Sequence, residues 1–258
     1  MDFFVENFQI FLLIFVRIFG MCVSAPLFSS GTIPFRVRAA VSVFMTVAVF
    51  PIVVNAIGTV PENMYSYALM IISEAVTGIL IGFLVSIIFS AFQLAARFFS
   101  FQMALGIAEV IDPFSQVGIT IVGQLWTLFG LLIFIAISGP HLLIMATVDS
   151  FARIRLIDIA GKSQVFIRVL TDTFGAMFVV ALKLAFPVLI TLFLLAITLG
   201  LLAKAAPQMN IFMVGFPLQI GVGFLIMLLV IGAVGAAMSN AITRIFEQLV
   251  TIIRAVGG

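Results

Sequence analysis

Residues 183–220 read KLAFPVLITLFLLAITLGLLAKAAPQMNIFMVGFPLQI, in which a short polar elbow separates two long apolar runs. Runs of this length and polarity are typical of membrane-crossing helices. The elbow, Lys204–Asn210, contains Pro207, Gln208 and Asn210. Proline has no backbone donor, and helix ends leave backbone groups without helical partners. The elbow is therefore predicted to need partner groups, which indicates an assembled membrane complex rather than a lone anchor.

The composition excludes an ordinary soluble domain. Of 258 residues, 64% are hydrophobic and 9% are charged, whereas about a quarter of a soluble domain is charged. The length suits roughly six membrane-length helices. The expected fold is therefore all-α and membrane-associated, with about six long, kinked helices arranged in hairpins. The formal net charge of +2 comes from scattered basic residues, so no nucleic-acid partner is predicted.

Apolar runs separated by Gly, Pro and polar residues predict where the helices lie. The predicted helices cover residues 3–19, 39–54, 74–97, 117–137, 173–203 and 216–242. The fifth is expected to bend at Pro187, because proline removes one helical hydrogen bond and clashes with the preceding turn. After a break at residues 138–141, Leu142–Val148 is apolar but too short to cross a bilayer alone. The most polar segment of the chain, residues 149–172, follows it.

Small residues recur at every fourth position of the third predicted helix, at Gly78, Gly82, Ser86 and Ser90. The spacing Gly78-x-x-x-Gly82 lets two helix backbones approach closely. We interpret the row as a packing ridge, with chance recurrence in a glycine-rich chain as the alternative. The spacing predicts contact with another helix without identifying it, and both glycines are candidates for subunit assembly.

Several charged residues lie within or beside apolar runs. They are Glu74, Glu109, Asp112, Lys183 and Lys204. Charges in such places are costly and are therefore candidates for function, with placement at the membrane interface as the alternative. The two lysines are 21 residues apart, about 31 Å along a helix. They are expected to mark opposite ends of the fifth helix and to extend toward the interfaces.

A loop near residues 106–116 combines a rigid Asp-Pro step with large apolar side chains. Such a loop can form a hydrophobic constriction, which gates a pore by excluding water, or it can cap the start of a helix. The candidate gating residues are Gly106, Ile107, Glu109, Val110, Ile111, Asp112, Pro113 and Phe114.

No catalytic, cofactor or metal site is predicted. Ser138, His141 and Asp149 are the only set that resembles a hydrolase triad, and no Gly-x-Ser-x-Gly elbow accompanies them. The sequence has no metal motif, Walker loop or paired-glycine nucleotide loop. Its single cysteine, Cys22, excludes a multi-cysteine metal site. The chain is therefore expected to be a non-enzyme without a cofactor.

The chain resembles the FliR family, the T-type subunits of type III secretion export gates. The resemblance is strongest in Gly200–Asn210 and Gly215-Phe-Pro-Leu-Gln-Ile220, with support from Pro34-x-Arg36-x-Arg38, Asp112-Pro113 and Gly139-Pro-His141. It covers nearly the whole chain and is closer to flagellar members than to those of virulence injectisomes. Gln219 departs from the family, which usually has lysine at this position.

The resemblance implies a core subunit of the flagellar export gate. Such a subunit forms a channel for unfolded flagellar polypeptides with P-type and Q-type subunits (FliP and FliQ), and it works with FlhB- and FlhA-type export proteins. Within the single subunit 1–258, residues 1–172 would be P-like and 173–258 a Q-like hairpin with a tail. Residues 106–116 would form the channel plug. The residues implied in subunit assembly are Gly78, Gly82, Lys204, Pro207, Gln208, Asn210 and Pro217.

The implied location is the bacterial inner membrane at the flagellar basal body. The gate would be displaced toward the periplasmic side, so that not every apolar helix need cross the bilayer. Alternatives are the equivalent subunit of a virulence injectisome, a secondary transporter for small solutes and an intramembrane enzyme that uses His141. A transporter predicts two comparable halves, and the breaks at Pro113, Pro140, Pro187 and Pro207 show no such symmetry.

Overall fold

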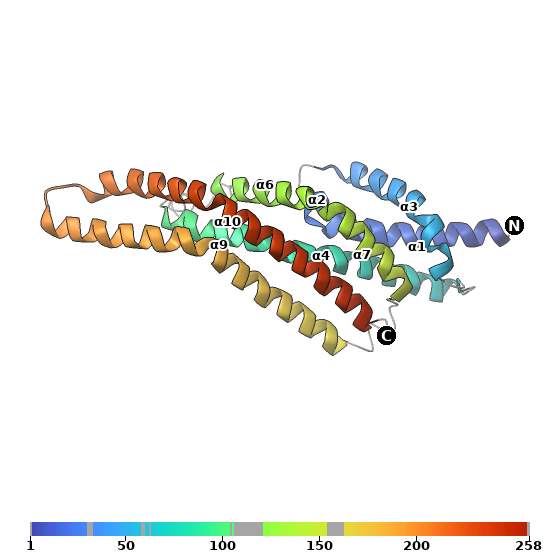
Figure 1. Ribbon diagram of the computed structural model, residues 1–258. Helices are drawn as coiled ribbons and strands as arrows, with labels where there is room; N and C mark the ends of the chain where they lie inside the picture. Colours follow the sequence, from blue (N-terminus) through green and yellow to red (C-terminus); the bar gives the residue numbers. More distant parts are fainter. Residues whose placement is uncertain are drawn as a thin grey trace. The chain divides into compact units, whose positions relative to one another are not determined.

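In the described part of the chain, every secondary-structure element of the computed structural model is a helix (Figure 1), which confirms the expected fold class. The structure describes residues 2–29, 33–57, 60–61, 63–103, 105, 121–153 and 163–256. Within these ranges, the helices are α1 (Asp2–Ser24), α2 (Pro26–Ser29), α3 (Phe35–Ile57), α4 (Met64–Gln102), α6 (Ile121–Ala136), α7 (Gly139–Arg153), α9 (Ser163–Ala205) and α10 (Ile211–Val256).

Five helices in the described part of the chain are long and apolar enough to cross a membrane. They are the apolar stretches Phe4–Ser24, Phe35–Ile57, Met64–Gln102, Ile167–Ala205 and Ile211–Glu247. A bent pair, Val122–Ala136 with Gly139–Ala152, raises the number to six if it is one broken span. The expectation of about six membrane-length helices is confirmed on length and composition.

The long helices extend beyond the apolar runs that predicted them. The helices α4, α9 and α10 contain 39, 43 and 46 residues. Helix α9 begins at Ser163, so residues 163–172 of the most polar segment are helical. An apolar run marks the part of a helix that avoids water, whereas backbone hydrogen bonding continues through helix-compatible polar residues. Pro187 lies near the middle of α9, and α9 changes direction part-way along its length in Figure 1, which agrees with the predicted bend.

The predicted break between the fourth apolar run and Leu142–Val148 is a tight turn. Ser138 has φ of 58°, in the left-handed region that is uncommon for residues with a side chain. Its amide donates to the carbonyl of Ile135 at 3.0 Å. A Cβ on Gly139 would come within 2.2 Å of the Phe134 ring, so only glycine fits there. The apolar segment that follows is the middle of α7 rather than a separate short element.

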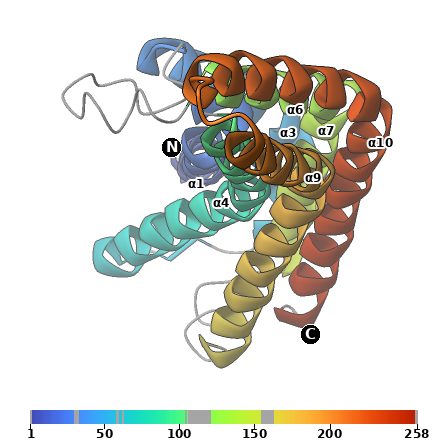
Figure 2. The same ribbon diagram turned by 90° about the vertical axis from the view of Figure 1, so that its left-hand side faces the viewer.

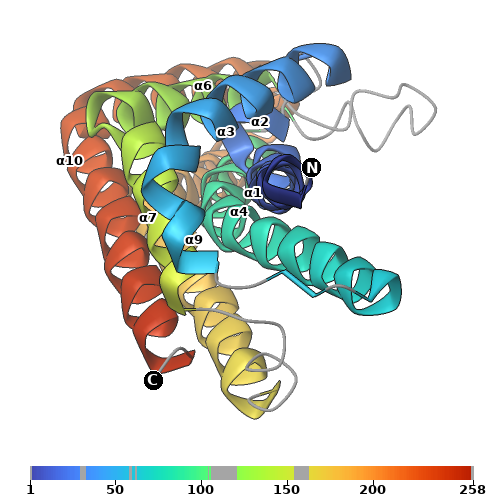
Figure 3. The same cartoon turned by 90° about the vertical axis from the view of Figure 1, so that its right-hand side faces the viewer.

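The chain divides into two compact units. Unit 1 contains residues 1–88, 134–174 and 242–258, and unit 2 contains residues 89–133 and 175–241. In unit 1, α1 packs against α3 and α7, and α3 also packs against α7; α1, α3 and the start of α4 can be followed in Figure 3. Fully buried side chains from α1, including Leu13, Ile14 and Met21, contribute to its core.

Unit 2 contains a long helical hairpin. The second half of α9 runs antiparallel to the first half of α10, and the connection between them faces the viewer in Figure 2. Large apolar side chains on both helices remain exposed, including Phe193 and Leu194 on α9 and Leu228 and Leu229 on α10. These faces require lipid or another protein chain as their environment, because a contiguous exposed apolar surface is unfavourable in water.

Candidate functional site

The predicted elbow is the connection at the tip of the hairpin. Helix α9 ends at Ala205, and α10 begins at Ile211. The amide of Ala206 donates to the Leu202 carbonyl at 2.9 Å, and the amide of Met209 donates to the Ala206 carbonyl at 3.0 Å. The turn therefore satisfies part of its own backbone, and its demand for external partners is smaller than the sequence alone predicts.

Asn210 begins the second helix of the hairpin as its N-cap. Its side-chain Oδ1 accepts a hydrogen bond from the Met213 amide at 3.4 Å, and its carbonyl accepts one from the same amide at 3.1 Å. Asparagine is a preferred N-cap because its side chain satisfies an amide that has no helical partner. Pro217 lies inside α10, and its missing N–H leaves the Met213 carbonyl without the usual helical donor.

The tip of the hairpin is exposed. Lys204, Pro207, Gln208, Asn210 and Pro217 all face the surface. The Gln208 amide has no hydrogen bond to any residue that the structure describes. Two large apolar side chains at the start of α10, those of Phe212 and Met213, are 72% and 78% exposed. The hairpin tip thus offers amide groups and apolar side chains together, a combination typical of protein interfaces.

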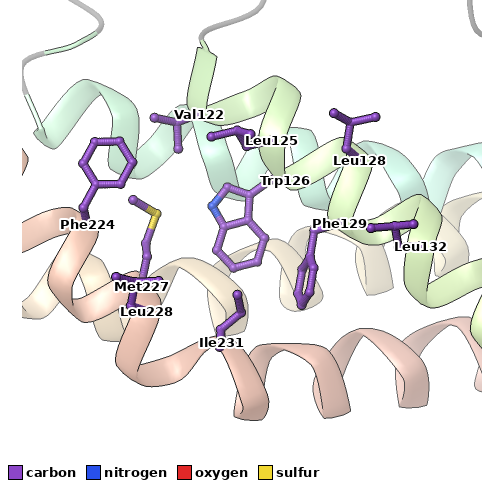
Figure 4. Close-up of a pocket in the computed structure, with 10 residues that line it drawn as sticks. All are labelled: Val122, Leu125, Trp126, Leu128, Phe129, Leu132, Phe224, Met227, Leu228 and Ile231. Carbon is purple, nitrogen blue, oxygen red and sulfur yellow. The ribbon is translucent and has the colours of Figure 1, made fainter.

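An apolar groove lies between α6 and α10 within unit 2 (Figure 4). Its volume is about 350 Å³. The side chains of Trp126 and Phe129 extend from α6 toward α10, and their ring centroids are 5.9 Å apart. The groove is lined by Val122, Leu125, Trp126, Leu128, Phe129, Leu132, Phe224, Met227, Leu228 and Ile231. Since its lining contains only apolar residue types, the groove can bury apolar groups and offers no acid, base or nucleophile.

Gly78 and Gly82 contact α1 inside unit 1. A Cβ on Gly78 would come within 2.0 Å of the Arg17 carbonyl oxygen, and a Cβ on Gly82 within 2.2 Å of Ser24 Oγ. The Ser24 hydroxyl also donates to the Ile79 carbonyl at 2.9 Å. The predicted close helix contact is therefore present at Gly78 and Gly82, and its partner is α1 of the same chain. An additional role of these glycines in subunit assembly stays a prediction.

A buried ion pair joins the same two helices. The guanidinium Nε of Arg17 on α1 bonds to the carboxylate Oε2 of Glu74 on α4. Arg17 is 1% exposed and Glu74 is 6% exposed. The Nη1 of Arg17 donates to Ser150 Oγ on α7 at 2.9 Å, and its guanidinium carbon lies 4.0 Å from the centroid of the Phe151 ring. Charge, hydrogen bonds and a cation–π contact all stabilise one buried guanidinium.

The ion pair shows what sequence reasoning missed. Glu74 is a candidate from its apolar surroundings, but Arg17 lies near the end of the first predicted helix, residues 3–19. Helix α1 continues to Ser24, so Arg17 is interior. One signal was available: an arginine and a glutamate within two apolar runs. Opposite charges placed in apolar helices tend to pair with one another.

The two lysine candidates are both exposed, and one expectation about them is wrong. Lys204 lies in the last turn of α9, where a cation interacts favourably with the helix dipole. Lys183 does not mark the other end of the helix, because α9 begins 20 residues earlier at Ser163. It lines a shallow groove with Phe186 and Pro187.

Ser138, His141 and Asp149 are not brought together. All three are exposed. His141 and Asp149 both lie on α7, eight residues apart, which corresponds to about 12 Å along the helix axis. No hydrogen bond joins any two of them, and the described residues contain no group of three or more His, Cys, Asp or Glu that could hold a metal ion.

The candidate gating residues lie outside the described residues. They are Gly106, Ile107, Glu109, Val110, Ile111, Asp112, Pro113 and Phe114. The described neighbours are α4, which ends at Gln102, and α6, which begins at Ile121.

Comparison with known proteins gives matches over nearly the whole chain. The family described as bacterial export proteins, family 1, matches residues 8–245. The flagellar biosynthetic protein FliR of Bacillus subtilis (strain 168) is 31% identical over 258 residues, with 98% of each chain covered. The FliR proteins of Borreliella burgdorferi and Escherichia coli (strain K12) are 30% and 28% identical, covering 93% and 92% of this chain and 89% and 90% of their own.

Proposed function

The chain belongs to the FliR family of bacterial export proteins, and from this membership we propose that it is a core structural subunit of a flagellar protein-export gate. The observation that carries the proposal is the family match over nearly the whole chain. The exposed apolar faces of α9 and α10 support it, because a subunit of a membrane assembly must present surfaces for its neighbours.

We propose P-type and Q-type subunits (FliP and FliQ) as the direct partners, with FlhB- and FlhA-type export proteins nearby. Residues 1–172 form the P-like part and residues 173–258 the Q-like hairpin with its tail. The proposed location is the bacterial inner membrane at the basal body, displaced toward the periplasmic side. The names of the relatives favour a flagellar system over an injectisome, since each is called a flagellar biosynthetic protein.

The elbow is the proposed contact with the other subunits, and removal of its side-chain amides tests this role. Changing Gln208 and Asn210 together to alanine should reduce co-purification with the P-type and Q-type subunits about tenfold, because it removes hydrogen bonds worth about 1.4 kcal/mol in total. The measurement is the ratio of partner to tagged chain after extraction from membranes that contain all three subunits.

The control for the elbow separates assembly from helix capping. Asn210→Asp keeps the cap oxygen that accepts from the Met213 amide and replaces the NH2 donors by a charged carboxylate oxygen, so Gln208→Ala with Asn210→Asp should also reduce co-purification. Thr198→Val is the matched variant, because the exposed Thr198 hydroxyl bonds to Leu194 of its own helix at 2.9 Å. Unchanged co-purification of both double variants would contradict the proposed role of the elbow.

The channel plug is the second part of the proposed function, and it rests on the residues of the loop together with family membership. Deleting residues 106–116 should make the assembled gate leak ions, because the apolar side chains would no longer exclude water from the channel. The measurement is membrane conductance in cells or vesicles that contain the complete gate, together with co-purification to show that the gate still assembles.

A length-preserving variant sharpens the plug test. Ile111→Ser with Phe114→Ser should give a smaller leak than the deletion, because it weakens the apolar constriction without shortening the loop. Ile157→Ser with Ile159→Ser makes two apolar-to-serine changes outside residues 106–116 and should not leak. An assembled deletion variant with wild-type conductance would show that these residues are not the plug.

A further inference from the structure

Helix α9 is too long to lie entirely within a bilayer. Its 43 residues extend about 65 Å, whereas the hydrocarbon core of a bilayer is about 30 Å thick. Only part of the helix can therefore lie against lipid tails. The charged residues of α9 leave one uncharged stretch of bilayer length, residues 184–203, which extends about 30 Å. These charged residues are Arg168, Asp172, Lys183 and Lys204.

The lysines at both ends of this stretch are exposed. Neither has a hydrogen bond or an ion pair with any residue that the structure describes. A lysine in the middle of a bilayer is strongly unfavourable, so the hydrocarbon core is expected to exclude both. Side chains on a helix tilt toward its N-terminus, which directs the Lys183 side chain away from residues 184–203. Both ammonium groups can then meet the phosphates of phospholipid headgroups, which carry the opposite charge.

The exposed surface of α10 changes at the level of the first of these lysines. A Cβ on Gly215 of α10 would lie 3.4 Å from the Leu199 side chain of α9. Counting equal numbers of residues from this contact along the two antiparallel helices (Figure 1) pairs Lys183 with Ile231. Among the described residues of α10, Ile231 is the last large apolar residue with an exposed side chain. The exposed residues of 232–240 are glycine, alanine and asparagine, so the apolar surfaces of both helices change at one level.

Two backbone carbonyls favour the same placement of the bilayer. Pro187 has no N–H, so the carbonyl of Lys183 lacks its usual helical donor, and Pro217 has the same effect on the carbonyl of Met213. A carbonyl without a donor is costly in hydrocarbon, where no water can bond to it. Lys183 lies at one edge of the uncharged stretch, and Met213 lies within one turn of Ile211, where α10 begins at the other edge. Water or headgroups can donate to both carbonyls there.

We propose that the bilayer crosses the hairpin between the levels of Lys183 and Lys204, with residues 184–203 of α9 and 211–231 of α10 against the lipid tails. The two lysines then lie in opposite headgroup layers and mark the faces of the membrane rather than the ends of a helix. Residues 175–182 lie outside the hydrocarbon core. The proposal requires residence in a membrane and not the export gate. It is therefore tested on the full-length chain without partner subunits, and co-purification remains a separate test of the gate.

The test measures the depth of nitroxide labels on the full-length chain in nanodiscs of phosphatidylethanolamine and phosphatidylglycerol. Single cysteines replace exposed residues in a Cys22→Ala background, which lacks the native thiol. Depth is the ratio of two collision rates of the label, one with oxygen, which partitions into hydrocarbon, and one with a water-soluble nickel chelate. The labelled positions are Gly175, Val179, Ile190, Leu194, Ile197 and Leu201 on α9 and Leu218 and Ala237 on α10.

The oxygen-to-nickel ratio should follow the uncharged stretch. It should be highest at Leu194, near the middle of residues 184–203, and about tenfold lower at Gly175, which lies about 12 Å beyond the edge. On α10 the ratio should be high at Leu218 and low at Ala237. No charged residue lies between these two positions, so composition alone would place both in hydrocarbon, and the difference between them is specific to the proposal.

Substitutions at Lys183 test whether its charge sets the edge. Lys183→Leu lengthens the uncharged stretch to residues 173–203, so the highest ratio should move toward the start of α9 by at least two residues, about 3 Å. Lys183→Arg keeps the charge and should keep the native profile. Arg168→Leu is the matched control, because it removes an exposed cation from the same helix without changing residues 184–203, and it should also keep the native profile.

Three results would overturn the proposal. Equal ratios at Gly175 and Leu194 would mean that the hydrocarbon core does not end at Lys183. Low collision rates with both reagents at Leu194 would mean that protein, and not lipid, covers this face of the hairpin. An unchanged profile in the Lys183→Leu variant would mean that the lysine does not set the edge of the membrane.

Discussion

Replacing Glu74 by leucine while Arg17 is retained should lower the free energy of unfolding by about 3–5 kcal/mol, because it leaves a buried charge without its partner. Arg17 is 1% exposed, so its guanidinium cannot reach water without moving α1. Two of its other contacts, the bond to Ser150 and the contact with the Phe151 ring, carry no opposite charge. The loss should appear as a lower midpoint of detergent-induced unfolding and a lower amount of chain in membranes.

The same measurement has a matched control on α1. Glu6 is an exposed carboxylate on that helix, and Glu6→Leu should change the free energy of unfolding by no more than about 0.5 kcal/mol. Combining Arg17→Leu with Glu74→Leu should recover most of the loss, because no unpaired charge remains. Equal losses for Glu6→Leu and Glu74→Leu would contradict the assigned role of the ion pair.

Gly78→Ala should lower the free energy of unfolding by about 2–3 kcal/mol, at the upper end of the loss that an added methyl group causes in a packed core. The new Cβ would lie 2.0 Å from the Arg17 carbonyl oxygen, and a backbone atom of a helix cannot move aside as a flexible side chain can. The two helices must therefore separate, which also stretches the Arg17–Glu74 bond. The measurement is again the detergent-induced unfolding midpoint.

Gly175→Ala is expected to change the free energy of unfolding in the opposite direction. Gly175 lies in α9, and a Cβ there meets no atom within 4 Å. Since alanine is favoured over glycine inside a helix by about 0.5–1 kcal/mol, this variant should be slightly more stable. A loss at Gly175 as large as that at Gly78 would show that close packing against α1 does not explain the cost of Gly78→Ala.

The parts of the fold that depend on local composition are predictable from the sequence. Long apolar runs identify the membrane-length helices, Pro187 indicates the bend in α9, and residues 204–210 identify the turn of the hairpin. Helix bounds are not predictable from the same signal: residues 163–172 are polar and nevertheless helical. The same limitation placed Lys183 at a helix end when it lies in the interior of α9.

The contacts that join distant parts of the chain could not be predicted. The Gly78–Gly82 spacing indicates a close helix contact, but every helix offers a similar apolar surface, so the partner α1 emerges only from the structure. Arg17 and Glu74 are 57 residues apart; their opposite charges in two apolar runs suggest a pair, but the sequence does not show that α1 and α4 are neighbours. Tertiary pairing in an apolar chain depends on these few polar groups, which are the least periodic features of the sequence.

The arginine of α1 also imposes an order on the synthesis of the chain. Arg17 leaves the ribosome 57 residues before Glu74 and 133 residues before Ser150. At roughly 5–20 residues per second, the guanidinium waits about 3–11 s for its carboxylate. During this interval the first helix carries a lone positive charge that the bilayer core disfavours. The nascent helix is therefore expected to remain at the translocon or the lipid surface until α4 is synthesised. The first helix to be made is thus among the last to reach its final position.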